Sequence, residues 1–456
     1  MQKFDAIIIG SGQAGNPLAF RLAKEGMKVA LIEKGPFGGT CVNVGCTPTK
    51  AYVASARRIW DAKHGLELGI HIPTGVRADL KLIKQRKEKI VAKSRDGIAQ
   101  GISENEHITF FDGKASFTGP KLVLVNDAQL TAEEIYINVG TSPRIPDEFR
   151  DPSFLTNESI LELEDLPEHL MIIGGGPIGL EFAQMFRRFG SKVTIVEQRK
   201  NLVQREDLKT SESILQILRN EGIRVHLETT CIRAGVEEED KICLHLESKS
   251  ANEILRGSHL LLAMGRKPNT EHLGLEKAGI AKDDKSFIRV NDYLETSIPG
   301  VFALGDCNGR GAFTHTSYND YEIIVANKFE GGDRKVTDRI QTYGIYIDPP
   351  LGRAGLTSRE AEAQGYKVLE ANYDMNKVSR AIEKNETQGY MSVLVDADNE
   401  KILGAAVLGV GGDEIISSIL NLMYAGKSYK IIRDSVVPHP TVSELIPTML
   451  QSLQEA

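Results

Sequence analysis

The chain carries the same glycine-rich pattern twice, and this repeat constrains its fold more than any other feature. Residues 8–15 read IIGSGQAG, and residues 172–179 read IIGGGPIG. In each copy a second aliphatic run follows and ends in an acid, Glu33 in the first and Glu197 in the second. Each copy therefore predicts a strand, a GxGxxG turn, a helix and a second strand. We expect an α/β protein with two Rossmann-like domains.

The three glycines of such a turn have separate roles. The first makes the tight turn, the second lets the backbone approach a pyrophosphate, and the third lets the helix pack closely on the strand. The acid can accept hydrogen bonds from a ribose diol. One copy would be weak support for a ligand, but two copies in register predict two adenine dinucleotide sites. The predicted residues are Gly10, Gly12, Gly15 and Glu33 in the first copy, and Gly174, Gly176, Gly179 and Glu197 in the second.

Length and charge exclude several classes of protein. The 456 residues are enough for two to four domains, and 41% hydrophobic with 26% charged residues is ordinary for a globular protein. The net charge of −7 argues against nucleic-acid and anionic-membrane surfaces. No apolar run is long enough to span a membrane, and the aliphatic run 6–9 is too short for the core of a signal peptide. We expect a cytoplasmic protein.

Two of the five cysteines, Cys41 and Cys46, lie close together in a glycine-rich loop. Pro48 favours the first turn of a following helix, so Cys46 is expected near a helix N-terminus, where the dipole stabilises a thiolate. The pair indicates redox chemistry or metal binding, with two structural cysteines as the plain alternative. Since no further thiol or imidazole lies nearby in sequence, we predict no metal site.

Hydrophobic periodicity predicts several further elements. They are a helix over 79–104 with a basic face, a strand pair over 225–246 around the acidic turn 237–240, strands at 389–395 and 402–408, and a helix over 413–425. Gly426 is placed to cap the last helix. Its apolar stripe fits core packing or a subunit interface equally well; the stripe comprises Ile415, Ile416, Ile419, Leu420 and Met423.

Several motifs in order make the chain recognisable as a whole. They are the fingerprint at Gly10, the loop GGTCVNVGCTPTK at 38–50, the fingerprint at Gly174, and the segments 265–269, 296–306 and 439–444. Together they resemble the pyridine nucleotide–disulfide oxidoreductases, which carry a flavin and a redox-active disulfide. Dihydrolipoamide dehydrogenase, glutathione reductase and mercuric reductase are familiar members.

The resemblance implies a domain order. It places an FAD-binding domain at 1–147, an inserted NAD(P)H-binding domain at 148–269, the rest of the FAD-binding domain at 270–338, and an α+β dimerisation domain at 339–456. It also implies a homodimer.

The resemblance assigns FAD to the first fingerprint, with Asp306 on the ribityl chain. It assigns the remaining cofactor contacts to Gly39, Thr40, Lys50, Gly140, Thr141, Gly265, Arg266 and His315. Cys46 is placed beside the flavin ring, and Cys41 becomes the outer thiol that meets substrate. Lys50 resembles a lysine near flavin N5 that pairs with a glutamate, here Glu181. A cation at that place stabilises the negative charge of the reduced ring.

The resemblance makes His439 and Glu444 an acid/base dyad contributed by the other subunit. Histidine is suited to move a thiol proton near neutral pH, and the glutamate would hold its tautomer.

The resemblance gives the second fingerprint to the nicotinamide nucleotide. Glu197 would repel a 2′-phosphate and favours NADH, as does Gly179, whereas Arg199 and Lys200 point towards NADPH.

The implied activity is electron transfer from NADH through FAD to a Cys41–Cys46 disulfide, and on to a small or protein-bound disulfide, or the reverse oxidation of a dithiol such as dihydrolipoamide. The alternative is a metal-ion reductase for mercury or copper, and a third reading is a binding or assembly subunit.

The sequence departs from the patterns of known members in four places. Residues 445–456 lack the cysteine pair of mercuric reductases, and no metal-binding domain is expected before Met1. Thr47 and Thr49 replace the usual residues of dihydrolipoamide dehydrogenases, and the segment 348–353 is unusual, as is Asn16-Pro17 after the third glycine.

Overall fold

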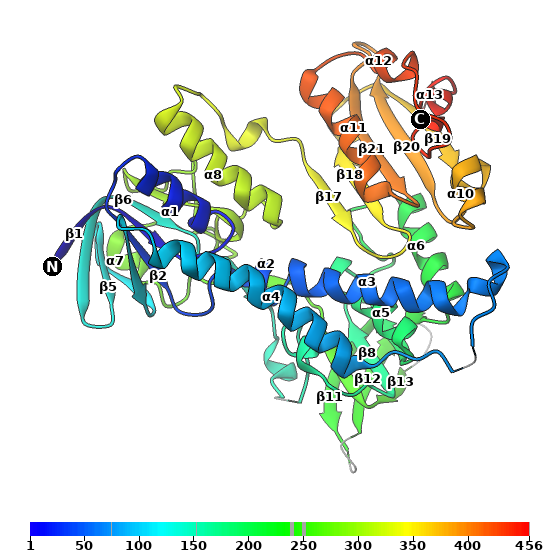
Figure 1. The fold of residues 1–456 in the computed structure, drawn as a ribbon, viewed down its shortest axis with the longest axis horizontal. Coiled ribbons are helices and arrows are strands. Elements are labelled where there is room, and N and C mark those ends of the chain that lie inside the picture. The colour runs from blue at the N-terminus through cyan, green and yellow to red at the C-terminus, as the bar shows by residue number, and fades with distance from the viewer. Residues whose placement is uncertain (74, 152, 238–240, 249–251, 456) are drawn as a thin grey trace. The chain divides into compact units, whose positions relative to one another are not determined.

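The computed structural model describes all residues except 74, 152, 238–240, 249–251 and 456. It forms two compact units, drawn in Figure 1. Unit 1 comprises Met1–Ala51, Lys84–Arg144 and Gly265–Arg339, and unit 2 comprises Tyr52–Ile83, Ile145–Met264 and Ile340–Ala456. Two of the boundaries between the units fall within helices, one in α3 (Cys46–Lys63) and one in α4 (Leu80–Ser103). Helix α4 confirms the helix predicted over 79–104.

Unit 1 is built on one sheet with the strand order β3-β2-β1-β6-β5-β4, to which β16 adds on β6. Its strands are β1 (Gln2–Ile9), β2 (Val29–Glu33), β3 (Ile108–Asp112), β4 (Ala115–Gly119), β5 (Leu122–Val125), β6 (Ala128–Ile137) and β16 (Val301–Ala303). Strands β3, β2, β1, β6 and β16 pair in parallel, whereas β4, β5 and β6 form an antiparallel meander. The helices of this unit include α1 (Gly15–Lys24), α2 (Gly39–Asn43), α7 (Leu275–Ala278) and α8 (Thr314–Phe329).

The central strand β1 is buried on both faces, which explains its unbroken aliphatic run. Ile7 and Ile9 belong to one buried cluster, whereas Ile8 packs with Leu18 and Leu22 of α1 in another. This alternation is the period-two pattern of a strand. The carboxyl ends of the parallel strands therefore meet at one edge of the sheet, the edge at which doubly wound folds bind ligands.

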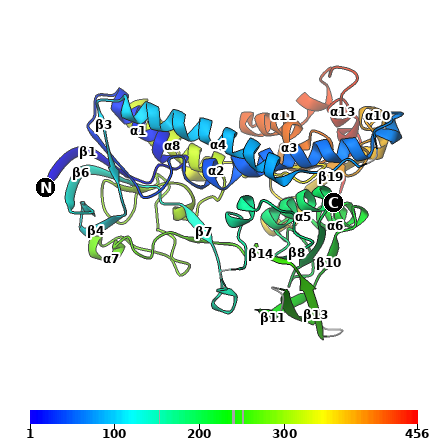
Figure 2. The same ribbon diagram turned by 60° about the horizontal axis from the view of Figure 1, so that its bottom comes forward.

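Unit 2 contains the second copy of the repeat. A parallel sheet has the order β10-β9-β8-β14, and Figure 2 shows α5 and α6 beside it. The bounds are β8 (His169–Ile173), α5 (Pro177–Phe189), β9 (Lys192–Val196), α6 (Leu208–Asn220), β10 (Arg224–His226) and β14 (His259–Leu262). Both copies thus confirm the predicted strand, turn, helix and second strand.

A three-stranded antiparallel sheet of β11 (Thr229–Val236), β12 (Ile242–Ser248) and β13 (Asn252–Gly257) follows. Cys231 and Cys243 lie in strands as predicted, but residues 224–226 form the separate parallel strand β10. The strand pair accordingly begins at Thr229. The predicted turn at 237–240 has residues 238–240 outside the described part of the chain.

The C-terminal part of unit 2 is a six-stranded antiparallel sheet with the order β17-β18-β21-β20-β19-β22. Its strands are β17 (Thr342–Ile345), β18 (Leu351–Gly355), β19 (Val368–Asp374), β20 (Tyr390–Asp396), β21 (Ile402–Leu408) and β22 (Gln454–Glu455). Helix α11 (Gly412–Ala425) packs on β18 and β21 and ends at Gly426, whose φ of 61° is left-handed. The backbone of α11 approaches the sheet closely: a Cβ on Gly352 of β18 would lie 2.2 Å from the carbonyl oxygen of Gly412, the first residue of α11.

The stripe predicted on α11 faces the core. Ile416 and Ile419 are buried, and Ile415, Leu420 and Met423 pack partly buried against the same cluster. The shorter helices of this region are α9 (Ser358–Ala363), α10 (Ser379–Glu383), α12 (Lys430–Arg433) and α13 (Leu445–Leu450). Among the described residues, no helix is long and apolar enough to cross a membrane.

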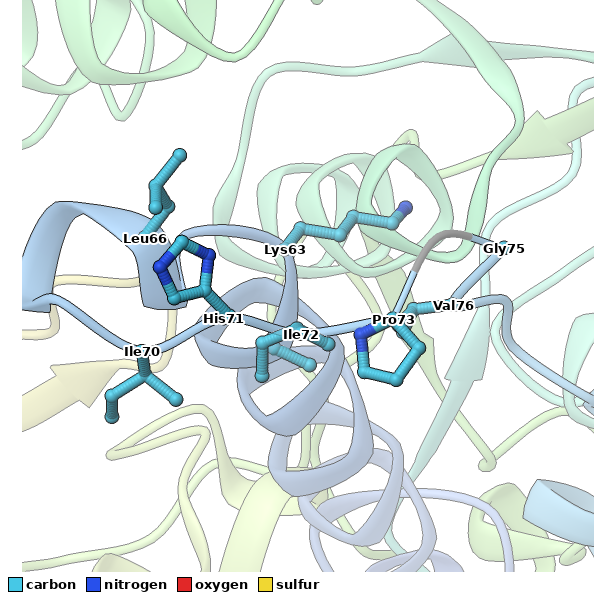
Figure 3. A pocket seen from close by; sticks show the side chains of 9 residues that line it. Lys63, Leu66, Ile70, His71, Ile72, Pro73, Gly75 and Val76 are labelled. Carbon is cyan, nitrogen blue, oxygen red and sulfur yellow. The ribbon is translucent and has the colours of Figure 1, made fainter.

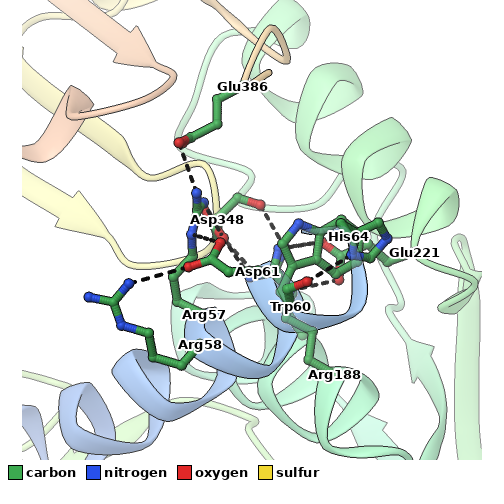
Figure 4. A network of polar contacts seen from close by, with 10 residues as sticks. Arg57, Arg58, Trp60, Asp61, His64, Arg188, Glu221, Asp348 and Glu386 are labelled. Carbon is green, nitrogen blue, oxygen red and sulfur yellow. Dashed lines mark hydrogen bonds and ion pairs between the residues drawn. The ribbon is translucent and has the colours of Figure 1, made fainter. Parts of the chain in front are cut away.

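The unusual segment 348–353 joins different parts of unit 2 through buried charges. Arg57 of α3 and Arg188 of α5 both donate to the Asp348 carboxylate, at 2.6 and 2.5 Å (Figure 4). Arg188 also pairs with Glu221 at 2.7 Å and stacks over the ring of Trp60, 4.4 Å from its centroid. Burial alone would raise the pKa of Asp348, but the two guanidinium groups hold it below its usual value.

Arg353 extends this anchoring. It is 2% exposed and donates to Glu206 at 2.5 Å and to Asp207 at 2.8 Å. The segment is thus an internal contact between β18 and the part of unit 2 that contains the second copy of the repeat.

Candidate active site

Cys41 and Cys46 come together in unit 1 under a single hydroxyl group. Cys41 lies in the short helix α2, and Cys46 is the first residue of α3, as Pro48 predicted. Both are free thiols, and Oγ1 of Thr314 lies 3.0 Å from the Cys41 sulfur and 3.2 Å from the Cys46 sulfur. A hydrogen bond with Cys46 and burial raise the pKa of Cys41, and the Thr314 hydroxyl opposes the rise.

The loop reaches this arrangement because its glycines permit tight turns. Gly38 and Gly39 have φ values of 94° and 61°, which favour glycine. A Cβ on Gly39 would lie 3.1 Å from the Cα of Gly12, so the loop packs directly on the first glycine-rich turn. Asn43 ties the end of α2 back to the loop by donating to the carbonyls of Phe37 and Gly39, at 2.8 and 2.9 Å. Helix α2, which includes Gly39 and Thr40, was not expected from the sequence.

The first glycine-rich turn is packed against a residue that sequence reasoning missed. Asn138, directly after β6, accepts a hydrogen bond from the Gly15 N–H at 3.0 Å and donates to the Leu304 carbonyl at 2.8 Å. A Cβ on Gly10 would lie 2.3 Å from the Asn138 carbonyl oxygen, and one on Gly12 would lie 2.7 Å from its Oδ1. Glycine is therefore required at both positions by contacts within the protein itself.

The carboxylate of Glu33 lies beside the same turn. It accepts hydrogen bonds from the backbone N–H and the hydroxyl of Ser11, both at 2.8 Å. The backbone N–H groups of Lys34 and Gly35 also donate to it, at 2.8 and 3.0 Å. Glu33 thus orders the turn, and its contact with a ribose stays a prediction.

Three of the expected FAD contacts form a chain of hydrogen bonds in unit 1. Arg266 donates to the hydroxyl of Thr141 at 2.8 Å, and this hydroxyl donates to Asp306 at 2.9 Å. Burial raises the pKa of Asp306, while Thr141 and Arg266 act in the opposite direction. His315 is exposed and stacks on Phe313 with ring centroids 5.3 Å apart.

Cys307, next to Asp306, is fully buried, and burial raises the pKa of its thiol to about 12. A buried thiol of this kind is a poor nucleophile.

The second glycine-rich turn has the same geometry as the first. A Cβ on Gly174 would lie 2.3 Å from the Ala263 carbonyl oxygen, and one on Gly179 would lie 2.1 Å from that of Gly174. Glu197 accepts from the N–H groups of Gly175 and Arg199, at 2.7 and 2.8 Å.

Both units fit the dinucleotides expected of them. At Gly140 and Gly176 an added Cβ would meet no described atom within 4 Å, so the backbone there is open to a ligand. The opening at Gly176 follows β8 at the carboxyl edge of its sheet, with Glu197 after the neighbouring strand β9 and the N-terminus of α5 beside it. The opening at Gly140 follows β6, which pairs in parallel with β1, at the edge where β2 ends in Glu33.

His439 and Glu444 form a pair within unit 2, just before α13. Nδ1 of His439 lies 2.9 Å from the Glu444 carboxylate, and the side chains are 76% and 16% exposed. The histidine is therefore held by its partner while its other ring nitrogen faces outward. Glu181 is buried in the same unit and accepts from the Tyr346 N–H at 2.9 Å. Lys50 lies one turn after Cys46 on α3, and its pairing with Glu181 stays a prediction.

A cavity of about 340 Å³ lies apart from these residues in unit 2 (Figure 3). Its walls include Lys63, Leu66, His71 and Ile72, around the end of α3 and the loop that follows. No predicted site residue lines it. Within the described chain, no cluster of three or more His, Cys, Asp or Glu side chains is arranged to hold a metal ion.

Comparison with known proteins decides the family. A family model described as pyridine nucleotide-disulphide oxidoreductase matches residues 4–320, and the dimerisation domain of the same family matches 342–450. The chain belongs to the pyridine nucleotide-disulphide oxidoreductase family. This confirms the α/β fold class, with its C-terminal dimerisation domain, and the disulfide oxidoreductase activity predicted from the sequence. The family uses FAD and a nicotinamide nucleotide.

Curated relatives cover nearly the whole chain. It is 35% identical to the probable pyridine nucleotide-disulfide oxidoreductase RclA of Escherichia coli, over 97% of this chain and 98% of that protein. It is 31% identical to a dihydrolipoyl dehydrogenase of Thermus scotoductus, over 100% and 98% of the two chains. A mercuric reductase of Staphylococcus aureus is 30% identical over 97% of this chain and 81% of its own.

One solved structure of a relative extends the comparison to the fold. The Cu(II) complex of the HOCl-induced flavoprotein disulfide reductase RclA matches with a TM-score of 0.89 and 34% identity, covering 98% of this chain and 99% of that chain.

Proposed function

We propose that the protein passes electrons from NADH through FAD to the Cys41–Cys46 pair and from there to a disulfide substrate. The observation that carries this proposal is the placement of two free thiols under one hydroxyl, beside the first glycine-rich turn. FAD, when bound, accepts hydride from the nicotinamide and delivers two electrons to the cysteine pair.

The two cysteines have separate parts in the proposal. The Cys41 thiolate attacks a substrate disulfide, which forms a mixed disulfide and releases one substrate thiolate. The Cys46 thiolate then attacks the Cys41 sulfur, releases the second substrate thiolate and closes the Cys41–Cys46 disulfide. The substrate gains two electrons and the cysteine pair loses two, and the reverse sequence oxidises a dithiol such as dihydrolipoamide.

His439 supplies the proton for the leaving thiolate in this scheme, from the second subunit of a homodimer. The match to the family's dimerisation domain supports the dimer, and the high exposure of His439 beside the largely buried Glu444 supports an outward-directed role. Glu444 would stabilise the imidazolium that forms.

Seven further residues hold and tune the cofactor in this proposal. Gly10, Gly12, Gly15 and Glu33 bind the adenosine diphosphate half of FAD, Asp306 binds its ribityl chain, and Lys50 lies near N5 with Glu181 as its partner.

We also infer a cytoplasmic protein, because a redox pair of this kind works between thiol and disulfide in a reducing compartment.

The preference for NADH rests on Glu197. Its carboxylate is fixed by two backbone N–H groups at the end of β9, so it stays where a 2′-phosphate would lie. Glu197→Gln should therefore reduce the ratio of kcat/KM for NADH to that for NADPH about tenfold, which corresponds to ~1.4 kcal/mol. A wild-type enzyme that uses NADPH as well as NADH would contradict this part of the proposal.

Metal-ion reduction is the second candidate. It is favoured by the likeness to an RclA structure described as a Cu(II) complex, and this chain presents two thiols, which would hold Hg(II) and the Cu(I) that forms on reduction. In this reading Cu(II) or Hg(II) is the substrate and takes its electrons at the Cys41–Cys46 pair.

A substrate panel separates the two candidates. Steady-state NADH oxidation is measured with lipoamide, with small and protein disulfides, with Hg(II) under excess small thiol, and with Cu(II) in the absence of added thiol, because thiols reduce Cu(II) themselves and form disulfide. We expect sustained turnover with a disulfide that is lost in Cys41→Ser and Cys46→Ser. If only the metal ions sustain turnover and no disulfide does, the proposed disulfide reduction is wrong and metal-ion reduction takes its place.

A further inference from the structure

Thr314 is the first residue of α8, and its hydroxyl lies between the two sulfurs. The distances from Oγ1 are 3.0 Å to Cys41 and 3.2 Å to Cys46. The three residues come from three separate helices, with Thr314 more than 260 positions beyond either cysteine. Tertiary structure, not a local motif, brings this hydroxyl to the thiol pair.

The hydroxyl of Thr314 does not cap its own helix. Thr316 makes the side-chain hydrogen bonds at the start of α8 instead: its Oγ1 accepts from the Phe313 N–H at 3.1 Å and donates to the Phe313 carbonyl at 2.7 Å. The first turn of α8 is therefore fixed by Thr316, and the Thr314 hydroxyl is directed at the two sulfurs.

A threonine hydroxyl has one hydrogen to donate and lone pairs that accept. It can donate to one sulfur at a time, and a thiolate accepts a stronger hydrogen bond than a neutral thiol does. The hydroxyl therefore gives its hydrogen to whichever sulfur carries the charge and can accept from the S–H of the other.

We propose that Thr314 is a positioning residue that stabilises the Cys41 thiolate during attack on substrate and transfers its hydrogen bond to Cys46 when the charge moves there. The proposal rests on the redox function proposed above for the cysteine pair. The proposal adds the Thr314 hydroxyl to the cysteine pair as a third group. This hydroxyl offsets the effects of Cys46 and of burial, which disfavour the Cys41 thiolate.

The electrostatics around Cys41 agree with this geometry. The Cys46 thiol and burial raise the pKa of Cys41, whereas the Thr314 hydroxyl and, to a smaller extent, a hydrogen bond with the Cys46 backbone lower it. Cys46 is the only titratable side chain among these influences. Loss of the hydroxyl should therefore leave the Cys41 thiol harder to ionise.

The test measures the thiols directly in the FAD-loaded, two-electron-reduced enzyme. Iodoacetamide alkylation of Cys41 is followed by peptide mass spectrometry across pH, for wild type, Thr314→Val and Thr314→Ser. In Thr314→Val we expect the apparent pKa of Cys41 to rise by about one unit, with alkylation at pH 7 slowed about tenfold. Thr314→Ser, which keeps the hydroxyl, should alkylate at a rate close to that of wild type.

Thr118→Val, at an exposed position on β4, is the matched control. It removes a threonine hydroxyl from the same unit without touching α8 or either cysteine, so it should leave the alkylation profile unchanged. Should Thr314→Val fail to retain FAD, Thr314→Ala removes the same hydroxyl and carries the same expectation. A profile in Thr314→Val or Thr314→Ala equal to that of wild type would overturn the proposal.

This readout does not depend on turnover. An enzyme inert towards every disulfide contradicts the proposed function, whereas an unchanged alkylation profile contradicts the role of Thr314 alone.

Discussion

The Asn138 side chain accepts a hydrogen bond from the Gly15 N–H at 3.0 Å, which fixes the end of the first glycine-rich turn from the neighbouring strand. The same amide donates to the Leu304 carbonyl at 2.8 Å, and Leu304 lies two residues before Asp306. One buried side chain thus holds together two parts of the region expected to bind FAD.

Asn138→Ala should lower both stability and FAD retention. The substitution removes the acceptor of the Gly15 N–H, and an unsatisfied buried group costs about 1–3 kcal/mol; the Leu304 carbonyl keeps a hydrogen bond from the Cys307 thiol. Thermal unfolding and the FAD absorbance per chain after gel filtration measure the two effects. Asn372→Ala, at an exposed position on β19, is the control and should change neither. Full FAD content in Asn138→Ala would show that the turn is held by other contacts.

Local pattern was enough to predict the two repeats, helix α11 with Gly426 and the position of Cys46 at the start of α3. In each case the signal lies within a few residues, as hydrophobic period, glycine or proline. The short helix α2 was missed because Gly38 and Gly39 favour a loop, although their left-handed turn leads into helix immediately.

Asn138 and Thr314 could not be predicted in the same way. Asn138 lies 123 positions from Gly15, and Thr314 lies 273 from Cys41. An asparagine after a strand and a threonine at a helix start are ordinary in many proteins, and only the folded chain shows what they face. The packing of segment 348–353 on α5 through Arg188 belongs to the same class of tertiary contact.

Two-electron reduction should give the FAD-loaded protein a broad long-wavelength absorption band. The proposal places the Cys46 thiolate beside the bound flavin, where it can donate charge to the ring. Cys46→Ser should abolish the band, whereas Cys41→Ser should keep or strengthen it, because the remaining thiolate is then Cys46. Anaerobic titration with dithionite or NADH measures both variants. If Cys46→Ser kept the band, Cys46 would not be the cysteine beside the flavin.

Subunit complementation should locate His439. Cys41→Ser and His439→Ala subunits are each expected to be inactive towards a disulfide. In a mixed dimer one of the two sites keeps both Cys41 and His439, so up to a quarter of the wild-type activity should return after statistical mixing, from half of the dimers with one of two sites intact. Native mass spectrometry verifies the heterodimer. Absence of rescue in verified heterodimers would place His439 at the site of its own subunit.

The Asp348 ion pairs should make stability depend on pH in the acid range. The pKa of Asp348 is lowered in the folded protein by Arg188 and Arg57, despite burial. A carboxylate with a depressed folded-state pKa stabilises the fold above its unfolded pKa of about 3.9, and this contribution is lost as pH falls through the folded value.

Asp348→Asn should therefore reduce the free energy of unfolding by about 2–4 kcal/mol at pH 7, since it removes the charge between two guanidinium groups while the shape is kept. The difference from wild type should begin to shrink below about pH 4, where the unfolded chain takes up a proton at Asp348, and should continue to shrink until pH reaches the lowered folded-state pKa, below which the folded carboxylate is neutral as well. Urea unfolding at several pH values measures both quantities. Asp398→Asn removes the exposed pair with Lys367, whose side chains are 65% and 75% exposed, and should change stability by less than about 1 kcal/mol. A destabilisation of Asp348→Asn that is the same at pH 7 and at pH 3 would show that hydrogen bonding, and not charge, anchors this segment.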